Sequence, residues 1–194
     1  MAIVFDDLLA RGVRKGEVPA RTASARDWYR KQAKGVRATP ESIIKSDPDR
    51  FRNQVRVGSM YHFFYDPKNK KTLPYYDRFP LIFPFKKVPG GFMGINLHYL
   101  PLPLRAKLMD ALYNLSTNDR YDEKTKLRLS YNILNSGSKY KWFKPCVKHY
   151  LSAHVRSRFL EVYSSEWDIA LFLPTERFVK SNKSKVHKDS REMI

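Results

Sequence analysis

The sequence predicts an α+β fold with N-terminal helices, a small central antiparallel β-sheet or partial barrel, a C-terminal helical bundle and a flexible basic tail. Apolar residues recur at helical spacing toward both ends, whereas aromatic and β-branched residues broken by proline and glycine fill the middle. The 194 residues are expected to form one compact domain with extensions: a helical basic arm (1–50), an antiparallel β module (51–100), a helical region (101–174) and a basic tail (175–194).

Two helices are predicted near the N-terminus. The first begins within the opening residues and can end at Gly12. The second covers residues 22–35, where Thr22 or Ser24 can cap the first turn and Gly35 can end the last one. Both helices carry many basic side chains, so we expect an exposed cationic surface on this arm.

The middle of the chain predicts three short antiparallel strands. They are expected at residues 57–65, 79–87 and 92–99. The segment "DPKNKK" provides the first turn and "VPGG" a tight hairpin, which is also the best explanation of Gly90 and Gly91. Pro80 and Pro84 lack backbone donors, so their strand is expected at a sheet edge or at a bulge.

The remainder predicts helices and a tail. Helices are expected in "PLPLRAKLMDALYNLST" (101–117), "DEKTKLRLSYNILNSG" (122–137), "HYLSAHVRSRFLEVY" (149–163) and "SSEWDIALFLP" (164–174). The basic end of the chain has no periodicity and is expected to stay flexible until a partner orders it.

Charge is the strongest functional signal. Thirty-seven Lys and Arg residues against 19 Asp and Glu give a formal net charge of +18. A surplus of this size repels itself in the folded state, so a polyanionic partner is expected: nucleic acid, an anionic membrane surface or an acidic protein. Nucleic acid is favoured, because each neutralised phosphate releases counterions. No run of residues is long and apolar enough for a membrane span, and the single cysteine rules out an internal disulfide, which favours a reducing compartment.

The candidate DNA-binding residues come from two basic stretches. No acidic residue occurs between Lys124 and Leu160, and aromatic rings there could stack on exposed bases. The second stretch, residues 11–37, shows the same bias. The predicted contacts are Arg26, Arg30, Lys34, Arg37, Lys139, Lys141, Trp142, Lys144, Lys148, Arg156 and Arg158. No module that reads base edges is recognisable, so binding by shape and charge, or recognition of an end, is expected.

Catalytic and metal sites are weakly indicated. Cys146, His149 and His154 form C-x2-H-x4-H, but zinc would need a fourth ligand, and a Cys146–His149 nucleophile pair lacks an orienting third group. His62 and His98 are best explained as hydrogen-bonded histidines of the sheet. We expect neither a cofactor nor a small-molecule ligand.

A metal-dependent nuclease would require clustered carboxylates. Glu161, Glu166 and Asp168 form the only close acidic set toward the C-terminus, and two serines between them resemble a helix boundary. Glu166 is better explained as a first-turn residue that favours the helix dipole.

Three stretches resemble a known family. "RTASARDWYRKQA", "MYHFFYDPKNKKTLPYYDRFPLIFPF" and "GGFMGINLHYLP", within residues 20–115, are similar to proteins of T-even-like tailed phages, and the chain is identified as a member of their DNA end protector family. The resemblance implies a minor virion protein that binds the terminus of the packaged linear duplex and shields it from host exonuclease without catalysis.

The resemblance also implies a location and partners. Such a protein is expected inside the phage head or at the neck, near portal and neck proteins, and in the host cytoplasm during assembly and after DNA entry. The alternative is a structural neck, head-completion or baseplate protein whose basic face meets acidic proteins of the particle. A DNA enzyme remains a third hypothesis, which the scattered carboxylates disfavour.

Overall fold

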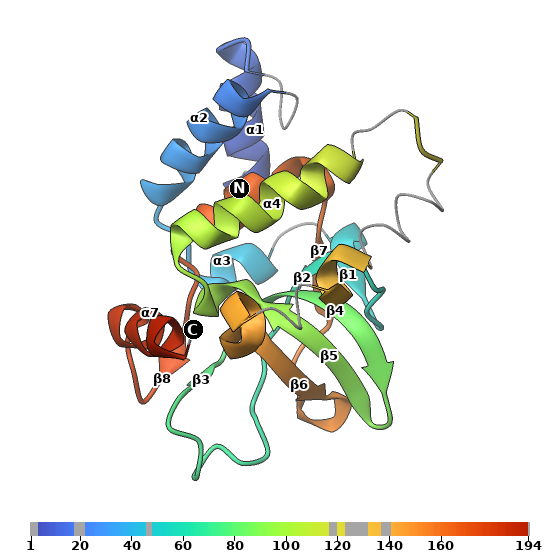
Figure 1. The fold of residues 1–194 in the computed structure, drawn as a ribbon. Helices are drawn as coiled ribbons and strands as arrows, with labels where there is room; N and C mark the ends of the chain where they lie inside the picture. The colour runs from blue at the N-terminus through green and yellow to red at the C-terminus, as the bar shows by residue number, and fades with distance from the viewer. Residues whose placement is uncertain are drawn as a thin grey trace.

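The computed structural model describes residues 4–17, 22–45, 48–116, 120–122, 132–136 and 141–193. It is an α+β fold, as predicted, in which helices pack on one face of a six-stranded antiparallel sheet (Figure 1). The sheet has the order β1-β7-β2-β4-β5-β6, and a separate two-stranded ribbon pairs β3 with β8. The sheet is open, so the predicted partial barrel does not form.

Helices α1 (Val4–Arg14) and α2 (Ala23–Lys34) confirm the predicted N-terminal pair. Thr22 caps α2 by accepting a hydrogen bond from the backbone N–H of Ala25, and Gly35 follows its last turn, as predicted. Gly12 does not end α1. It lies inside the helix with its Cα against Tyr29 of α2, so the absence of a side chain serves helix packing.

The sheet is built from two distant parts of the chain. One part supplies β1 (Phe51–Arg52), β2 (Met60–His62), β4 (Leu81–Val88) and β5 (Gly91–Asn96), and the other supplies β6 (Val147–Leu151) and β7 (Phe159–Val162). The ribbon strands are β3 (Tyr76–Asp77) and β8 (Phe178–Val179). The predicted hairpin joins β4 to β5 through Gly90, which has a φ of 74°.

Strand β4 corrects one expectation and confirms another. It lies between β2 and β5, so it is not an edge strand. Its pairing with β5 shifts register between Pro84 and Lys86, which is the predicted bulge. The bulge accommodates a proline in a central strand, where a regular ladder would need its missing N–H.

The predicted helix at residues 149–163 is wrong. This segment forms the end of β6, a 3-10 turn (Ser152–His154) and β7. The sheet is buried on both faces: in β7, Phe159 joins one cluster while Leu160 and Val162 join the other. Strands buried on both faces lose the polar–apolar alternation, so their apolar spacing also fits a helix. The C-terminal part is therefore a mixture of strands and helices and not a helical bundle.

The helical layer covers one sheet face. It contains α3 (Pro40–Ile44), α4 (Leu102–Ser116) and α6 (Trp167–Phe172), of which α4 and α6 confirm predicted helices. Residues 132–136 are helical within the predicted segment 122–137, most of which lies outside the described residues. Buried residues of these helices join those of α1 and α2 and of the strands in one core.

The prediction of a flexible basic tail is also wrong, because this segment is folded. Residues 178–179 form β8 and Lys183–Glu192 form α7, which packs with Val186 fully buried. Asn182 caps α7 by accepting from the N–H of Lys185. Lys180, with a φ of 64°, donates three hydrogen bonds to carbonyls of the loop at 70–73. The basic end of the chain is thus held by packing and hydrogen bonds.

Candidate nucleic-acid interface

The sheet face away from the helices carries an aromatic cluster. Adjacent strand residues point to opposite faces, so Phe92 faces this cluster while Met93 packs on the helical core. The cluster consists of Val55, Tyr61, Phe63, Tyr65, Ile82, Phe92, Tyr150 and Phe159, with Val155 packed against it. Phe159 packs within this cluster, with its ring centroid 5.0 Å from that of Phe63 and 5.8 Å from that of Phe92.

A concave site opens beside this cluster, and we call it the sheet-face hollow. Its volume is about 690 Å3. It is lined by Asn53, Gln54, Val55, Lys87, Gly91, Phe92, Ser152, Val155, Arg156, Ser157, Arg158 and Phe159. These residues come from the loop after β1, the β4–β5 hairpin and the connection from β6 to β7. The hollow therefore depends on pairing between strands that are far apart in the sequence.

Three cations line the sheet-face hollow. Arg158 donates from Nε to Asn53 Oδ1 (3.1 Å) and from Nη2 to the carbonyl of Phe51 (3.0 Å), and its guanidinium lies 5.5 Å from the Phe51 ring centroid. Arg156 donates to the carbonyl of Ala153.

The charges of these cations have few carboxylate partners. Within the described parts of the chain, neither Lys87 nor Arg158 forms an ion pair, and Arg156 has only Asp66 at 4.0 Å. These charges are therefore open to an external anion.

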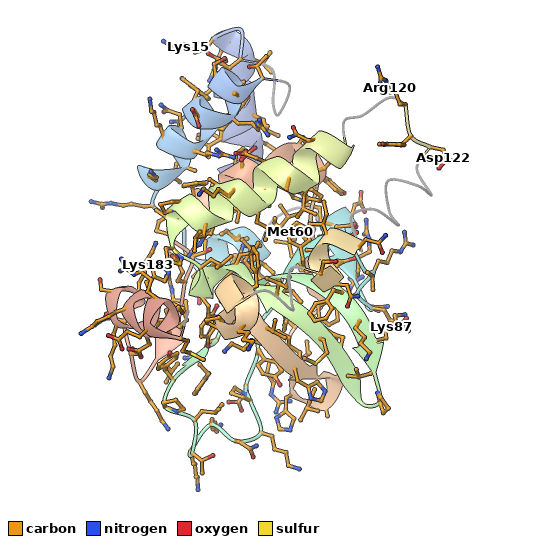
Figure 2. All side chains as sticks on the ribbon, viewed as in Figure 1. Lys15, Met60, Lys87, Arg120, Asp122 and Lys183 are labelled. Carbon is orange, nitrogen blue, oxygen red and sulfur yellow. The ribbon has the colours of Figure 1, made fainter. Side chains whose placement is uncertain are left out.

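A second cationic surface lies on the N-terminal helices α1 and α2. We call it the hairpin patch, after this pair of helices and not after the β4–β5 hairpin. It is a hollow of about 410 Å3 lined by Arg11, Arg14, Lys15, Trp28 and Gln32. Arg11 is paired with Asp7 one turn earlier in α1. Lys15 and Lys87 lie in well-separated parts of the molecule (Figure 2), so the two surfaces are distinct.

Of the four predicted site residues of the N-terminal arm, Arg26 and Arg30 form ion pairs with described residues. Arg30 donates to Asp168 (2.8 Å) and to Asp110 (2.9 Å), and Arg26 lies 3.3 Å from Asp110. Lys34 lies 5.2 Å from the ring centroid of Phe172, and Arg37 is exposed. Arg26 and Arg30 therefore hold α2 to α4 and α6, and neither residue lines the sheet-face hollow or the second hollow on α1 and α2.

The remaining predicted residues that the structure describes lie in different places and do not form one site. Arg156 and Arg158 lie at the sheet-face hollow, and Lys144 is exposed in a 3-10 turn (Lys141–Cys146). Lys148 is half-buried in β6 with Nζ 4.0 Å from the ring centroid of Tyr99, and burial lowers its pKa. Lys139 and the side chains of Lys141 and Trp142 lie outside the described part of the structure.

The predicted DNA contacts do not include three residues that line the sheet-face hollow: Lys87, Asn53 and Gln54. Lys86 and Lys87 directly precede "VPGG", so a paired basic signal stood beside the predicted hairpin. Asn53 and Gln54 carry no comparable signal, because only the pairing of β1 with β7 brings their loop next to Arg158.

The three carboxylates considered for a nuclease are each paired with an arginine. Glu166 accepts from Arg50 at 2.6 Å in a buried pair, Asp168 accepts from Arg30, and Glu161 lies 2.8 Å from Arg52. The geometry therefore gives these carboxylates a structural role: Asp168 joins α6 to α2, Glu161 joins β7 to β1, and Glu166 joins the 3-10 turn before α6 to the one before β1.

The cysteine and histidines also have structural surroundings. Burial raises the pKa of the Cys146 thiol to about 12, so the thiol is held in its unreactive form. His154 lies 2.8 Å from the carbonyl of Asp66. His62 and His98 are both buried. The ring of His62 is within hydrogen-bond distance of the carbonyl of Pro80, and the ring of His98 is within hydrogen-bond distance of the carboxylate of Asp77. Among the described residues there is no group of three His, Cys, Asp or Glu side chains arranged to hold a metal ion, and no helix long and apolar enough to cross a bilayer.

Comparison with known proteins decides the family. A model of the family described as phage T4 terminal DNA protecting protein matches residues 10–191. The chain belongs to this family. The match confirms the predicted resemblance and extends it from residues 20–115 to nearly the whole chain, including the sheet-face hollow and α7. No curated protein and no solved structure matches this member of the terminal DNA protecting family.

Proposed function

We propose that the protein binds the end of a linear double-stranded genome and shields it from exonuclease by occupying the end, without making or breaking a covalent bond. Membership of the terminal DNA protecting family supports the role in phage DNA end protection. The observation that carries the physical part of the proposal is the sheet-face hollow, where Lys87, Arg156 and Arg158 line one concave surface. Among the described residues, its one carboxylate partner is Asp66, 4.0 Å from Arg156.

Two cationic surfaces suit a short target. A duplex end offers few phosphates, so contacts on more than one side of the duplex increase the number that a small protein can neutralise. The sheet-face hollow and the hairpin patch are separate surfaces on a chain with a net charge of +18. We propose that the hollow meets the end itself and that the hairpin patch contacts the flanking duplex.

The setting is part of the proposal. We propose that the protein acts within the virion, in the head or near the neck with portal or neck proteins as neighbours, and enters the host cytoplasm with the DNA. Cross-linking of intact particles that joined the protein to packaged DNA termini would support this setting. Incorporation as a symmetric ring on neck proteins, with no affinity for free DNA, would instead support a structural neck protein.

A competition experiment tests end binding. The protein is bound to a labelled linear duplex and challenged with the unlabelled linear duplex or with a covalently closed circle of the same sequence. The linear competitor is expected to displace the label at lower concentration. Binding of the linear duplex should also fall with salt, by a slope of about −0.9 in log affinity against log salt for each phosphate contacted. Equal competition by the circle would contradict recognition of the end.

A further inference from the structure

The lining of the sheet-face hollow combines three kinds of chemistry. Cations stand at Lys87, Arg156 and Arg158, amide side chains at Asn53 and Gln54, and an apolar floor is formed by Val55, Phe92, Val155 and Phe159. A nucleotide has matching parts: a phosphate, a base edge with donors and acceptors, and an apolar sugar and base face. A row of phosphates on a duplex would need only the cations.

We propose that the sheet-face hollow receives the terminal nucleotide of the DNA, separated from its pairing partner, with its phosphate held by Arg158, Arg156 and Lys87. This inference rests on the proposed binding of DNA ends and names the part of the end that is recognised. The volume of about 690 Å3 lies within the range of small-ligand sites, which suits one nucleotide.

The shape of the site favours a terminal nucleotide over an internal one. Duplex DNA is convex, and its bases are stacked inside it, so a concave site with an apolar floor can be filled only by a group that leaves the stack. An internal nucleotide has to be flipped out against stacking on both sides and against its base pair. A terminal nucleotide is stacked on one side only, and an unpaired one has no base pair to break, so it enters at lower cost.

Arg158 is oriented for a phosphate before any DNA binds. Its bonds to Asn53 and to the carbonyl of Phe51 fix the guanidinium, and the Phe51 ring lies beside it. These bonds use only part of the five N–H donors of an arginine. The remaining donors can form charge-assisted hydrogen bonds to phosphate oxygens, and less side-chain entropy is lost because the group is already held.

The amide groups add contacts that a phosphate site alone would not need. Asn53 accepts from Arg158 through Oδ1, which leaves its amide nitrogen as a donor. Gln54 is exposed at the hollow and carries both a donor and an acceptor. A base edge placed against this wall can therefore be hydrogen-bonded while its face rests on the apolar floor.

The test uses open-ended DNA and a closed circle as probes. One probe is a hairpin duplex with a single open end that carries one unpaired 5′-phosphorylated nucleotide, and the other is a covalently closed circular duplex. Arg158→Ala removes the oriented guanidinium, and Ser152→Leu fills space in the hollow without removing a charge. Lys185→Ala, which removes an exposed charge from α7, is the matched control.

The expected result is a selective loss of end preference. Arg158→Ala should weaken binding of the open end by about tenfold or more, the effect of losing one charge-assisted hydrogen bond. Ser152→Leu should weaken it as well, because the larger side chain occupies space that the nucleotide needs. Neither variant should change the affinity for the circle. Lys185→Ala should change the two affinities equally or not at all. Arg158→Lys, which keeps the charge, should restore only part of the loss, because lysine lacks the planar fork.

The chemistry of the end provides the second arm. Removing the terminal phosphate, or moving the unpaired nucleotide to the 3′ side, identifies which phosphate is bound. Removal of the bound phosphate should weaken binding of the probe by the wild-type protein but not by Arg158→Ala. If the wild type prefers the open end and both Arg158→Ala and Ser152→Leu keep that preference, the hollow is not the subsite. If the wild type shows no preference for the open end, the proposed function itself is wrong.

Discussion

One buried imidazole, that of His62, is expected to make the fold sensitive to acid. Its ring stacks on Phe79 with centroids 4.6 Å apart, and its Nδ1 lies 3.2 Å from the carbonyl of Pro80. Burial, followed by the nearby charge of His98, lowers the pKa of His62 from 6.5 to about 3, although Asp77 and Glu176 act in the opposite direction. The native protein therefore keeps this ring neutral at pH values where the unfolded chain protonates it.

The sign and size of the effect follow from proton linkage. Because the pKa of the native state is the lower one, the stabilisation is fully present above pH 6.5 and is lost as the pH falls toward 3. Each pH unit within this window lowers the free energy of unfolding by about 1.4 kcal/mol. Between pH 7 and pH 4.5 the loss from His62 alone is therefore about 3 kcal/mol, a large part of the stability of a typical domain.

The assay compares wild type with His62→Phe, which keeps an aromatic ring against Phe79 but cannot titrate. The free energy of unfolding is measured by urea titration, followed by tryptophan fluorescence, at pH 7 and at pH 4.5. Between pH 7 and pH 4.5, the free energy of unfolding of the wild type should fall by about 3 kcal/mol more than that of the variant, whatever their difference at pH 7. Equal losses in the two proteins would show that His62 takes up its proton in the native state and would refute the reasoning.

Two further predictions concern the frame of the molecule. Gly12→Ala should destabilise the α1–α2 pair by about 1–3 kcal/mol, because a Cβ there would lie 1.8 Å from the hydroxyl of Tyr29, whereas Gly35→Ala should be nearly neutral. A matched lowering of the melting temperature by both variants would contradict this. Lys180→Met should speed amide hydrogen exchange in the loop at 70–73, whose carbonyls lose their ammonium donor, while Lys185→Met serves as the control. Unchanged exchange in Lys180→Met would show that the loop is held by other contacts.

Local signals in the sequence predicted the elements that depend on neighbouring residues. The caps at Thr22 and Gly35, the hairpin at Gly90 and the bulge in β4 were each predicted from residue types whose backbone preferences decide the structure. The family resemblance was likewise visible in short stretches.

Elements that depend on long-range pairing were not predictable in the same way. The segment from β6 to β7 follows apolar spacing that fits either a helix or a strand buried on both faces, and only its pairing with β5, β2 and β1 decides the outcome. The same pairing brings Lys87 and Arg158 to one hollow. The pairing of Arg30 with Asp168, 138 residues apart in the chain, also had no local signal. Basic composition therefore indicated a polyanionic partner but not which cations are left without carboxylates.

The central claim is that the cationic surfaces cover a DNA end, and an exonuclease assay tests it most directly. A linear duplex is incubated with the protein at a ratio of one to a few molecules per end and is then exposed to an exonuclease that degrades from double-strand ends. We predict that degradation slows in proportion to occupied ends and that Lys87→Ala with Arg158→Ala abolishes the protection. Degradation at the unprotected rate, under salt conditions where the wild-type protein is bound to the duplex, would contradict the account.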